Sequence, residues 1–98
     1  MISQKLLEQM IRKYGESKQL DIAIEECSEL IKAISKYKRN EDDPSRIKSM
    51  AEEEADVRIM LEQIDIMMLK HDPDYTKRVK CEMNIKEQRI KKMLGINE

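Results

Sequence analysis

Apolar residues recur every three or four positions through four segments of this chain, which is the spacing of an amphipathic α-helix. Between these segments lie Gly15 and two short polar stretches, at 39–44 and 71–74. The pattern therefore predicts four helices and no strands. We expect them at about 4–14, 17–38, 46–70 and 75–94.

The residues at the ends of these segments are typical of helix termini. Ser3, Ser45 and Asp74 stand where helices should begin, and each can accept a hydrogen bond from a backbone N–H of the first turn. Gly15 and Gly95 stand where helices should end. Short connections between helices favour antiparallel packing. We therefore expect residues 1–98 to form one all-α, four-helix bundle-like domain.

Four acidic side chains fall on or beside the faces that should be buried. The apolar face of the second helix is centred near Cys27 and Ile34, and Glu26 and Glu29 lie along one border of it. In the third helix Glu53 falls inside the apolar face, and Asp56 lies at its edge, one turn further along. By contrast, Glu25 points away from the apolar face of its helix.

Buried carboxylates need a positive partner, because an unpaired buried charge is costly and several like charges repel one another. Divalent cations are one candidate. The acid pairs include no histidine or thiolate ligand, so an oxygen-only site favours Mg²⁺ or Mn²⁺. The other candidate is a set of ordinary ion pairs, in which Lys or Arg side chains along the helix borders neutralise each acid separately. The pattern alone leaves both readings open.

Composition narrows the classes of partner. The chain has 98 residues, 19 Lys or Arg and 20 Asp or Glu, which gives a net charge of −1 and argues against a nucleic-acid polymer as partner. Its apolar runs are too short to span a membrane, and no signal peptide is recognisable, so we expect a cytoplasmic protein. Cys27 and Cys81 lack metal-site spacing.

A second apolar patch on the third helix, formed by Ala55, Ile59 and Ile66, lies roughly opposite the first. A helix that is apolar on two sides needs neighbours on two sides. We expect a second subunit to cover this patch; the alternative is that the first helix of the same chain covers it.

The acid pairs also form a recognisable motif. Glu25-Glu26-Cys27-Ser28-Glu29, followed by Glu53-Glu54-Ala55-Asp56, resembles the EExxE…ExxD signature of the MazG-like all-α nucleoside triphosphate pyrophosphohydrolases. The resemblance extends from about residue 14 to 90. It implies a MazG-type helical bundle that assembles as a homodimer or homotetramer. It also implies Mg²⁺-dependent hydrolysis of a ribo- or deoxyribonucleoside triphosphate to the monophosphate and pyrophosphate.

The resemblance assigns roles residue by residue. The implied metal ligands are Glu26, Glu29, Glu53 and Asp56, the same four that the helical pattern selects. Glu53 and Glu25 are the expected catalytic carboxylates, although Glu25 either reaches a metal-bound water or merely lies on the surface. Lys80, Asn84 and Arg89 resemble the residues that the family carries on its last helix and are expected to contact the phosphates, and Lys36 is a further candidate because it is a cation on the acidic helix.

Two other functions remain compatible with the same residues. The first is a non-catalytic helical interaction module, in which the acids form ion pairs between helices. The second is a protein that binds a nucleotide without turning it over.

Overall fold

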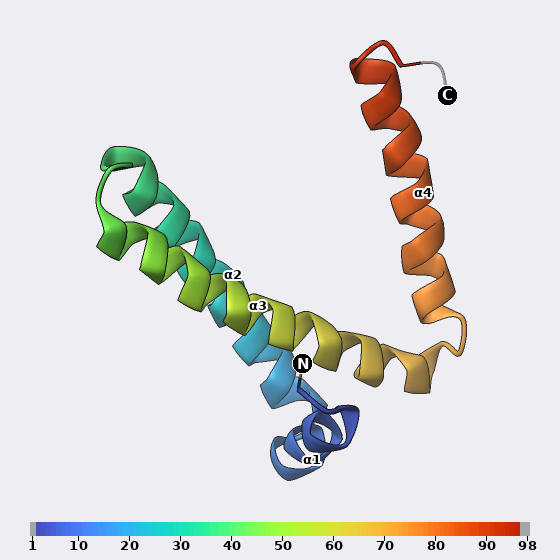
Figure 1. Ribbon diagram of the computed structural model, residues 1–98. Coiled ribbons are helices and arrows are strands. Elements are labelled where there is room, and N and C mark those ends of the chain that lie inside the picture. The colour runs from blue at the N-terminus through green and yellow to red at the C-terminus, as the bar shows by residue number, and fades with distance from the viewer. Residues whose placement is uncertain (1, 97–98) are drawn as a thin grey trace. The chain divides into compact units, whose positions relative to one another are not determined.

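The computed structural model describes residues 2–96, of which 86% are helical, and none of these residues forms a strand. This confirms the all-α prediction (Figure 1). The helices begin and end within about two residues of the predicted positions. They are α1 (Gln4–Tyr14), α2 (Glu16–Arg39), α3 (Pro44–His71) and α4 (Tyr75–Met93).

The chain divides into two compact units, one ending at Met67 and the other beginning at Met68. The first unit contains α1, α2 and most of α3. The second contains the last turn of α3 and all of α4. Antiparallel packing is found for α2 and α3, and a bundle of all four helices stays a prediction.

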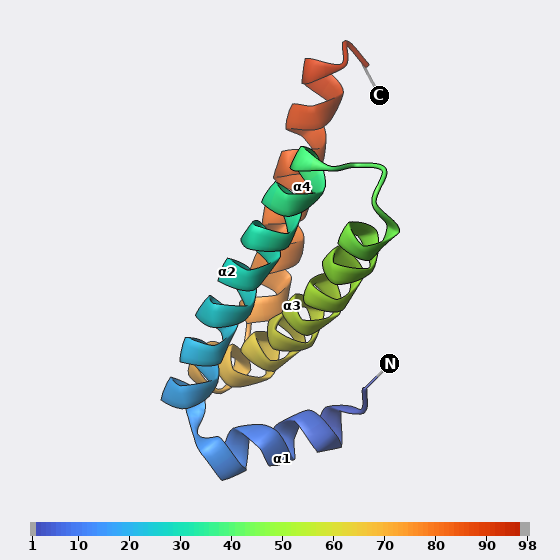
Figure 2. The same ribbon diagram turned by 90° about the vertical axis from the view of Figure 1, so that its left-hand side faces the viewer.

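The junction between α1 and α2 is a single glycine. Ser3 caps α1 as expected, because its hydroxyl accepts a hydrogen bond from the Leu6 N–H at 3.2 Å. Gly15 ends the helix with φ +87° and ψ 155°, and its N–H donates to the Ile11 carbonyl at 2.8 Å. This backbone conformation is essentially confined to glycine. It lets α2 start at Glu16 while α1 lies across the end of the α2–α3 pair (Figure 2).

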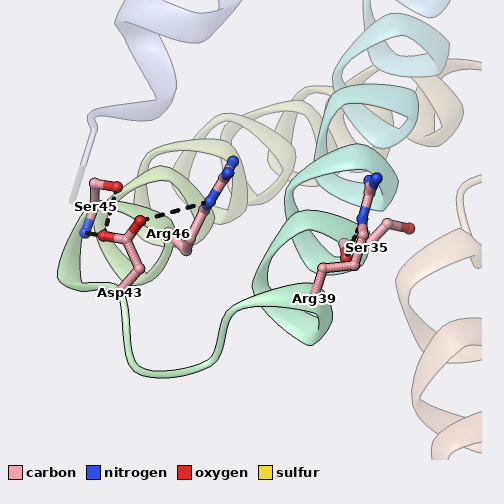
Figure 3. A network of polar contacts seen from close by, with 5 residues as sticks. All are labelled: Ser35, Arg39, Asp43, Ser45 and Arg46. Atoms are coloured by element: carbon pink, nitrogen blue, oxygen red, sulfur yellow. Dashed lines mark hydrogen bonds and ion pairs between the residues drawn. The ribbon is translucent and has the colours of Figure 1, made fainter.

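The connection from α2 to α3 is made by Asn40–Asp43, and its cap differs from the prediction. The Asp43 carboxylate accepts hydrogen bonds from the Ser45 backbone N–H at 2.9 Å and from the Ser45 hydroxyl at 2.8 Å (Figure 3). These bonds lower the pKa of Asp43. Ser45 was expected to cap α3, but it lies inside the helix, because Pro44 is well suited to the first helical position.

Asp72 organises the turn before α4. Its carboxylate accepts hydrogen bonds from the Asp74 N–H at 3.0 Å and from the Arg78 guanidinium. The hydrogen bond from Arg78 is the main cause that lowers the pKa of Asp72. Asp74 holds the cap position, as predicted, but its side chain makes no capping hydrogen bond. At the other end of α4, Gly95 has a φ of +72° and follows the last helical turn.

The buried face of α2 is not the one that the apolar pattern predicts. Ala23 and Ala33 are buried, whereas Cys27 is exposed and Ile34 is 40% exposed. Ala23 and Ala33 lie on the same side of the helix as Glu26. The prediction was wrong because an apolar pattern does not show which side has a neighbour within the chain.

On α3 the predicted apolar stripe agrees better with the residues that are buried. Met60 and Met67 are buried, as expected from the apolar stripe, although Leu61 on the same stripe is 52% exposed. Part of the second patch lies beside the N-terminal part of the same chain: Ile59 lines one pocket together with Met10 and another together with Ile2. For Ile59 the structure therefore supports the alternative of coverage within the chain.

Two further expectations concern the described residues as a whole. Within 2–96, no helix combines the length and the apolar character that crossing a membrane requires. Cys27 and Cys81 are both free thiols.

We predict that Gly15→Ala lowers the free energy of unfolding by about 1–3 kcal/mol, the cost of holding a residue with a Cβ atom in this backbone conformation. An added Cβ would meet no atom within 4 Å, so backbone strain is the only expected cause. Urea unfolding measures the change, with the exposed Ser17→Ala as control. Equal stability of Gly15→Ala and the wild type would contradict this account of the junction.

Candidate metal centre

The antiparallel pairing of α2 and α3 brings residues from distant parts of the sequence together (Figures 1 and 2). The loop at 40–43 fixes the register of the two helices, because it joins them with only four residues. Gln19 near the start of α2 therefore lies opposite Gln63 on α3. Two turns further along α2, Glu26 lies opposite Glu53 and Asp56.

Glu26, Glu53 and Asp56 form a carboxylate cluster. One carboxylate oxygen from each residue lies within 4.8 Å of those of the other two. Glu26 and Glu53 are half-buried, and Asp56 is exposed. Glu53 and Asp56 are three residues apart on α3 and therefore point to the same side of the helix. The structure thus unites three of the four acids that the sequence selects.

The electrostatics of Glu26 reflect this crowding. Partial burial is the largest cause that raises the pKa of Glu26, because removal from water disfavours the charged form. The Asp56 charge and a hydrogen bond between the two carboxyl groups raise the pKa further, followed by the charges of Glu53 and Glu29. Without a cation, Glu26 therefore holds a proton more readily than an ordinary glutamate.

Glu29, the fourth acid, lies at the edge of this arrangement. It is exposed, and its carboxylate lies 3.3 Å from the Lys32 ammonium group. The charge of Glu29 still raises the pKa of Glu26, so Glu29 is close enough to interact electrostatically with that residue of the cluster. The three-residue cluster does not include it, and its role as a ligand stays a prediction.

The remaining predicted site residues lie outside the cluster. Glu25 is exposed, as its position opposite the apolar face suggested. Lys36 is exposed on α2, two turns or more beyond Glu26. The other expected phosphate contacts are exposed residues of α4, in the second unit: Lys80, Asn84 and Arg89.

The donor set of the cluster suits a hard divalent cation. Three carboxylates offer oxygen ligands, which Mg²⁺ and Mn²⁺ prefer. Within residues 2–96, the Lys and Arg ion pairs engage other acids, such as Glu29 with Lys32 and Glu54 with Arg58 at 2.7 Å. The alternative of separate ion pairs therefore applies to Glu29, which has Lys32 as its neighbour. It does not apply to the three clustered carboxylates.

A pocket of about 200 Å³ adjoins the cluster. Its apolar lining comes from α1, α2 and α3, namely Met10, Ile22, Ile59 and Met60. Its polar lining consists of the Glu26 and Asp56 side chains together with Gln19 and Gln63. The same two carboxylates thus belong to the cluster and to the wall of the pocket.

Gln19 and Gln63 form a buried amide pair. Their side chains are 1% and 2% exposed, and the Gln19 Nε2 donates a hydrogen bond of 2.7 Å to the Gln63 Oε1. The Gln63 Nε2 reaches the Met60 sulfur at 3.7 Å, and the Gln19 Oε1 has no hydrogen-bond partner in the structure. An unsatisfied buried acceptor costs about 1–3 kcal/mol.

Sequence reasoning missed this pair, although a signal existed. Gln63 falls between Met60 and Met67 on the buried stripe of α3. A polar side chain on a predicted buried face indicates a buried polar interaction, and Glu53 was selected for this reason.

Comparison with protein-family models, with curated proteins and with solved structures gave no match.

We predict that Glu26→Gln raises the thermal midpoint in EDTA at pH 7, because it removes one of several crowded negative charges. The folded-state pKa of Glu26 lies above its unfolded value, so its charge costs stability at high pH. As the pH falls to about 4, Glu26 becomes protonated in both the folded and the unfolded state, so its charge no longer costs stability. The increase in thermal midpoint caused by Glu26→Gln should therefore disappear. Thermal unfolding at several pH values measures both.

The control is Glu25→Gln, which removes an exposed charge from the adjacent position. A lower midpoint for Glu26→Gln in EDTA at pH 7, or a benefit that persists below pH 4, would contradict the repulsion described here.

Proposed function

We propose that this chain is a Mg²⁺-dependent nucleoside triphosphate pyrophosphohydrolase of the MazG-like type. It would convert a ribo- or deoxyribonucleoside triphosphate and water into the monophosphate and pyrophosphate. The observation that carries the proposal is the convergence of Glu26, Glu53 and Asp56 from two helices. The resemblance of the surrounding motifs to EExxE…ExxD supports it independently of the geometry.

Glu26, Glu53 and Asp56 are the proposed metal ligands, and Glu29 is the fourth. When bound, Mg²⁺ would neutralise charge on the phosphate oxygens and lower the pKa of a coordinated water. The crowding that raises the pKa of Glu26 in the metal-free protein favours cation binding, because a dication relieves the repulsion. Mn²⁺ has similar ligand preferences and should substitute.

The protein's own contribution to hydrolysis is to position groups and accept a proton. As the water oxygen bonds to phosphorus and the pyrophosphate oxygen leaves, one water proton must be taken up. We assign this role to the Glu53 carboxylate oxygen that does not bind the metal, in preference to Glu25, which is exposed outside the cluster. Other steps need little covalent chemistry from the protein, as in phosphoryl transfer generally.

Cationic and amide side chains would bind the phosphates that the metal leaves uncovered. The proposed residues are Lys36 on α2 and the α4 residues Lys80, Asn84 and Arg89. Lys36 is included as a cation on the helix that carries Glu26, whereas the three α4 residues come from the family resemblance and belong to the second unit of the chain.

We also propose a homodimer or homotetramer. Ile24 and Ile31 are 69% and 64% exposed on α2, and Ile34 beside them is 40% exposed. A second subunit would remove this apolar surface from water. The same exposed face supports the main rival function, a helical interaction module without catalysis.

We predict that Mg²⁺ raises the thermal midpoint of the wild-type protein. A ligand that binds only the folded state at about 100 times its Kd adds about 2.7 kcal/mol of stability. Glu53→Gln should reduce this shift and slow pyrophosphate release by about 10²–10⁴-fold, the usual contribution of a general base. The assay is a panel of ribo- and deoxyribonucleoside triphosphates with Mg²⁺ or Mn²⁺.

The matched control is Glu52→Gln, an exposed acid next to Glu53, which should behave like the wild type. An interaction module predicts no Mg²⁺ shift and no pyrophosphate. A protein that binds nucleotides without turnover predicts the shift alone. Unchanged turnover in Glu53→Gln, at wild-type helicity, would contradict the assignment of Glu53.

A further inference from the structure

The proposed metal centre attracts a dication but repels its substrate. Four carboxylates around a single dication keep a net negative charge, and a triphosphate is itself strongly anionic. A basic side chain must therefore lie close to the carboxylates if a phosphate chain is to bind beside them. The carboxylate cluster belongs to the first unit of the chain, so the Lys and Arg side chains of that unit are the first candidates.

Lys32 is the basic residue of α2 that lies closest to Glu26 along the helix. It follows Glu26 by six residues and Glu29 by three, which places it about 9 Å and about 4.5 Å further along the helix axis. Lys36 lies about 15 Å beyond Glu26 on the same axis. Lys32 is thus better placed than Lys36 to reach a phosphate that is bound at the carboxylates.

The contact that Lys32 makes with Glu29 is easily exchanged. The Lys32 Nζ lies 3.3 Å from the Glu29 Oε1, whereas strong hydrogen bonds between charged groups measure about 2.7–2.9 Å. The two side chains are 62% and 50% exposed, and ion pairs in such positions contribute little stability. An ammonium group has three N–H donors, and Glu29 accepts from one of them. Two donors therefore remain for the oxygen atoms of a ligand.

Glu29 connects this ammonium group to the cluster. Glu26 and Glu29 are three residues apart on the same side of α2, and the charge of Glu29 acts on Glu26 in the structure. A carboxylate that binds a metal has less negative charge to offer an ammonium group. Binding of a cation at Glu26 and Glu29 would therefore weaken the hold of Glu29 on Lys32.

We propose that Lys32 is a phosphate-binding residue of the metal centre and that Glu29 positions it beside the carboxylates. In the metal-free protein Lys32 donates to Glu29; when Glu29 binds the metal, Lys32 exchanges this carboxylate for an oxygen of the phosphate chain. The inference rests on the proposed function and deepens it, because it names a substrate contact and couples it to metal binding. The shared chemistry of the ligand is a metal-bound polyphosphate.

The experiment compares two probes by isothermal titration calorimetry on the full-length protein: Mg²⁺ alone, and inorganic tripolyphosphate in excess Mg²⁺. Lys32→Gln should bind tripolyphosphate roughly tenfold or more weakly than the wild type, the usual effect of losing a hydrogen bond to a charged group. The same variant should bind Mg²⁺ alone at least as tightly as the wild type, because the neutral side chain neither holds Glu29 nor repels the cation. A residue with a purely structural role would not change the two affinities in opposite directions.

Two further variants serve as controls. Lys32→Arg keeps the positive charge and should retain most of the tripolyphosphate affinity. Lys38→Gln removes an exposed lysine from the same helix and should bind both probes as the wild type does. Because Lys32 is exposed, all three variants should match the wild-type thermal midpoint in EDTA to within a few degrees. In the wild type, the ¹³Cε resonance of Lys32 should shift when tripolyphosphate is added.

The two probes separate this inference from the proposed function. Normal Mg²⁺ binding together with wild-type tripolyphosphate affinity in Lys32→Gln would overturn the role of Lys32 and leave the metal centre standing. Equal weakening of both probes in Lys32→Gln would also overturn it, because Lys32 would then act only through the metal centre. Absence of Mg²⁺ binding by the wild type would refute the metal centre, and the role of Lys32 with it.

Discussion

The structure depends on how two paired helices accommodate negative charge at their interface. α2 and α3 place the carboxylates of Glu26, Glu53 and Asp56 within 4.8 Å of one another, where water cannot screen them fully. In the metal-free protein, partial burial and then the neighbouring acidic charges raise the pKa of Glu26, so a proton relieves part of the repulsion. A divalent cation would relieve more of it and would stabilise the helix pair at the same time. The proposed site and the stability of the unit that holds it are therefore coupled.

The positions of these carboxylates follow from short connections. The Asp43 carboxylate caps α3 directly after a four-residue loop, and this fixes which residues of α2 and α3 face each other. Gly15 turns the chain so sharply that α1 lies beside the same helix pair, and Met10 thereby contributes to the lining of the pocket. The carboxylates, the apolar walls and the glutamine pair thus all belong to residues 10–63, within one compact unit.

Local sequence predicts the helices well because their ends are determined locally. Ser3, Gly15 and the polar stretch at 39–44 mark helix termini through interactions within a few residues. The buried side of α2 was predicted wrongly for the opposite reason: Cys27 and Ile34 form its most apolar side, yet Ala23 and Ala33 are the residues that are buried. Packing between helices decides which side is buried, and the periodicity within α2 does not show it.

The contrast between local signals and contacts between distant segments also explains which parts of the candidate site the sequence predicts. Acids at i and i+3 on one helix can be recognised from spacing, and the motif resemblance joined the two pairs. Gln19 and Gln63 are 44 residues apart, and only the register of the folded helices shows that their amides meet. Glu29 has the right spacing, but whether it binds a cation or only Lys32 depends on side-chain positions that spacing does not specify.

The most direct test of the account is the pKa of Glu26, measured from the ¹³C resonance of its carboxyl group during a pH titration with EDTA and again with Mg²⁺. A bound dication competes with protons for the carboxylates and stabilises their charged forms. We expect the pKa of Glu26 to lie above its ordinary value in EDTA and to fall when Mg²⁺ is added. A Glu26 pKa that is the same with and without Mg²⁺ would contradict the metal site on which the proposed function rests.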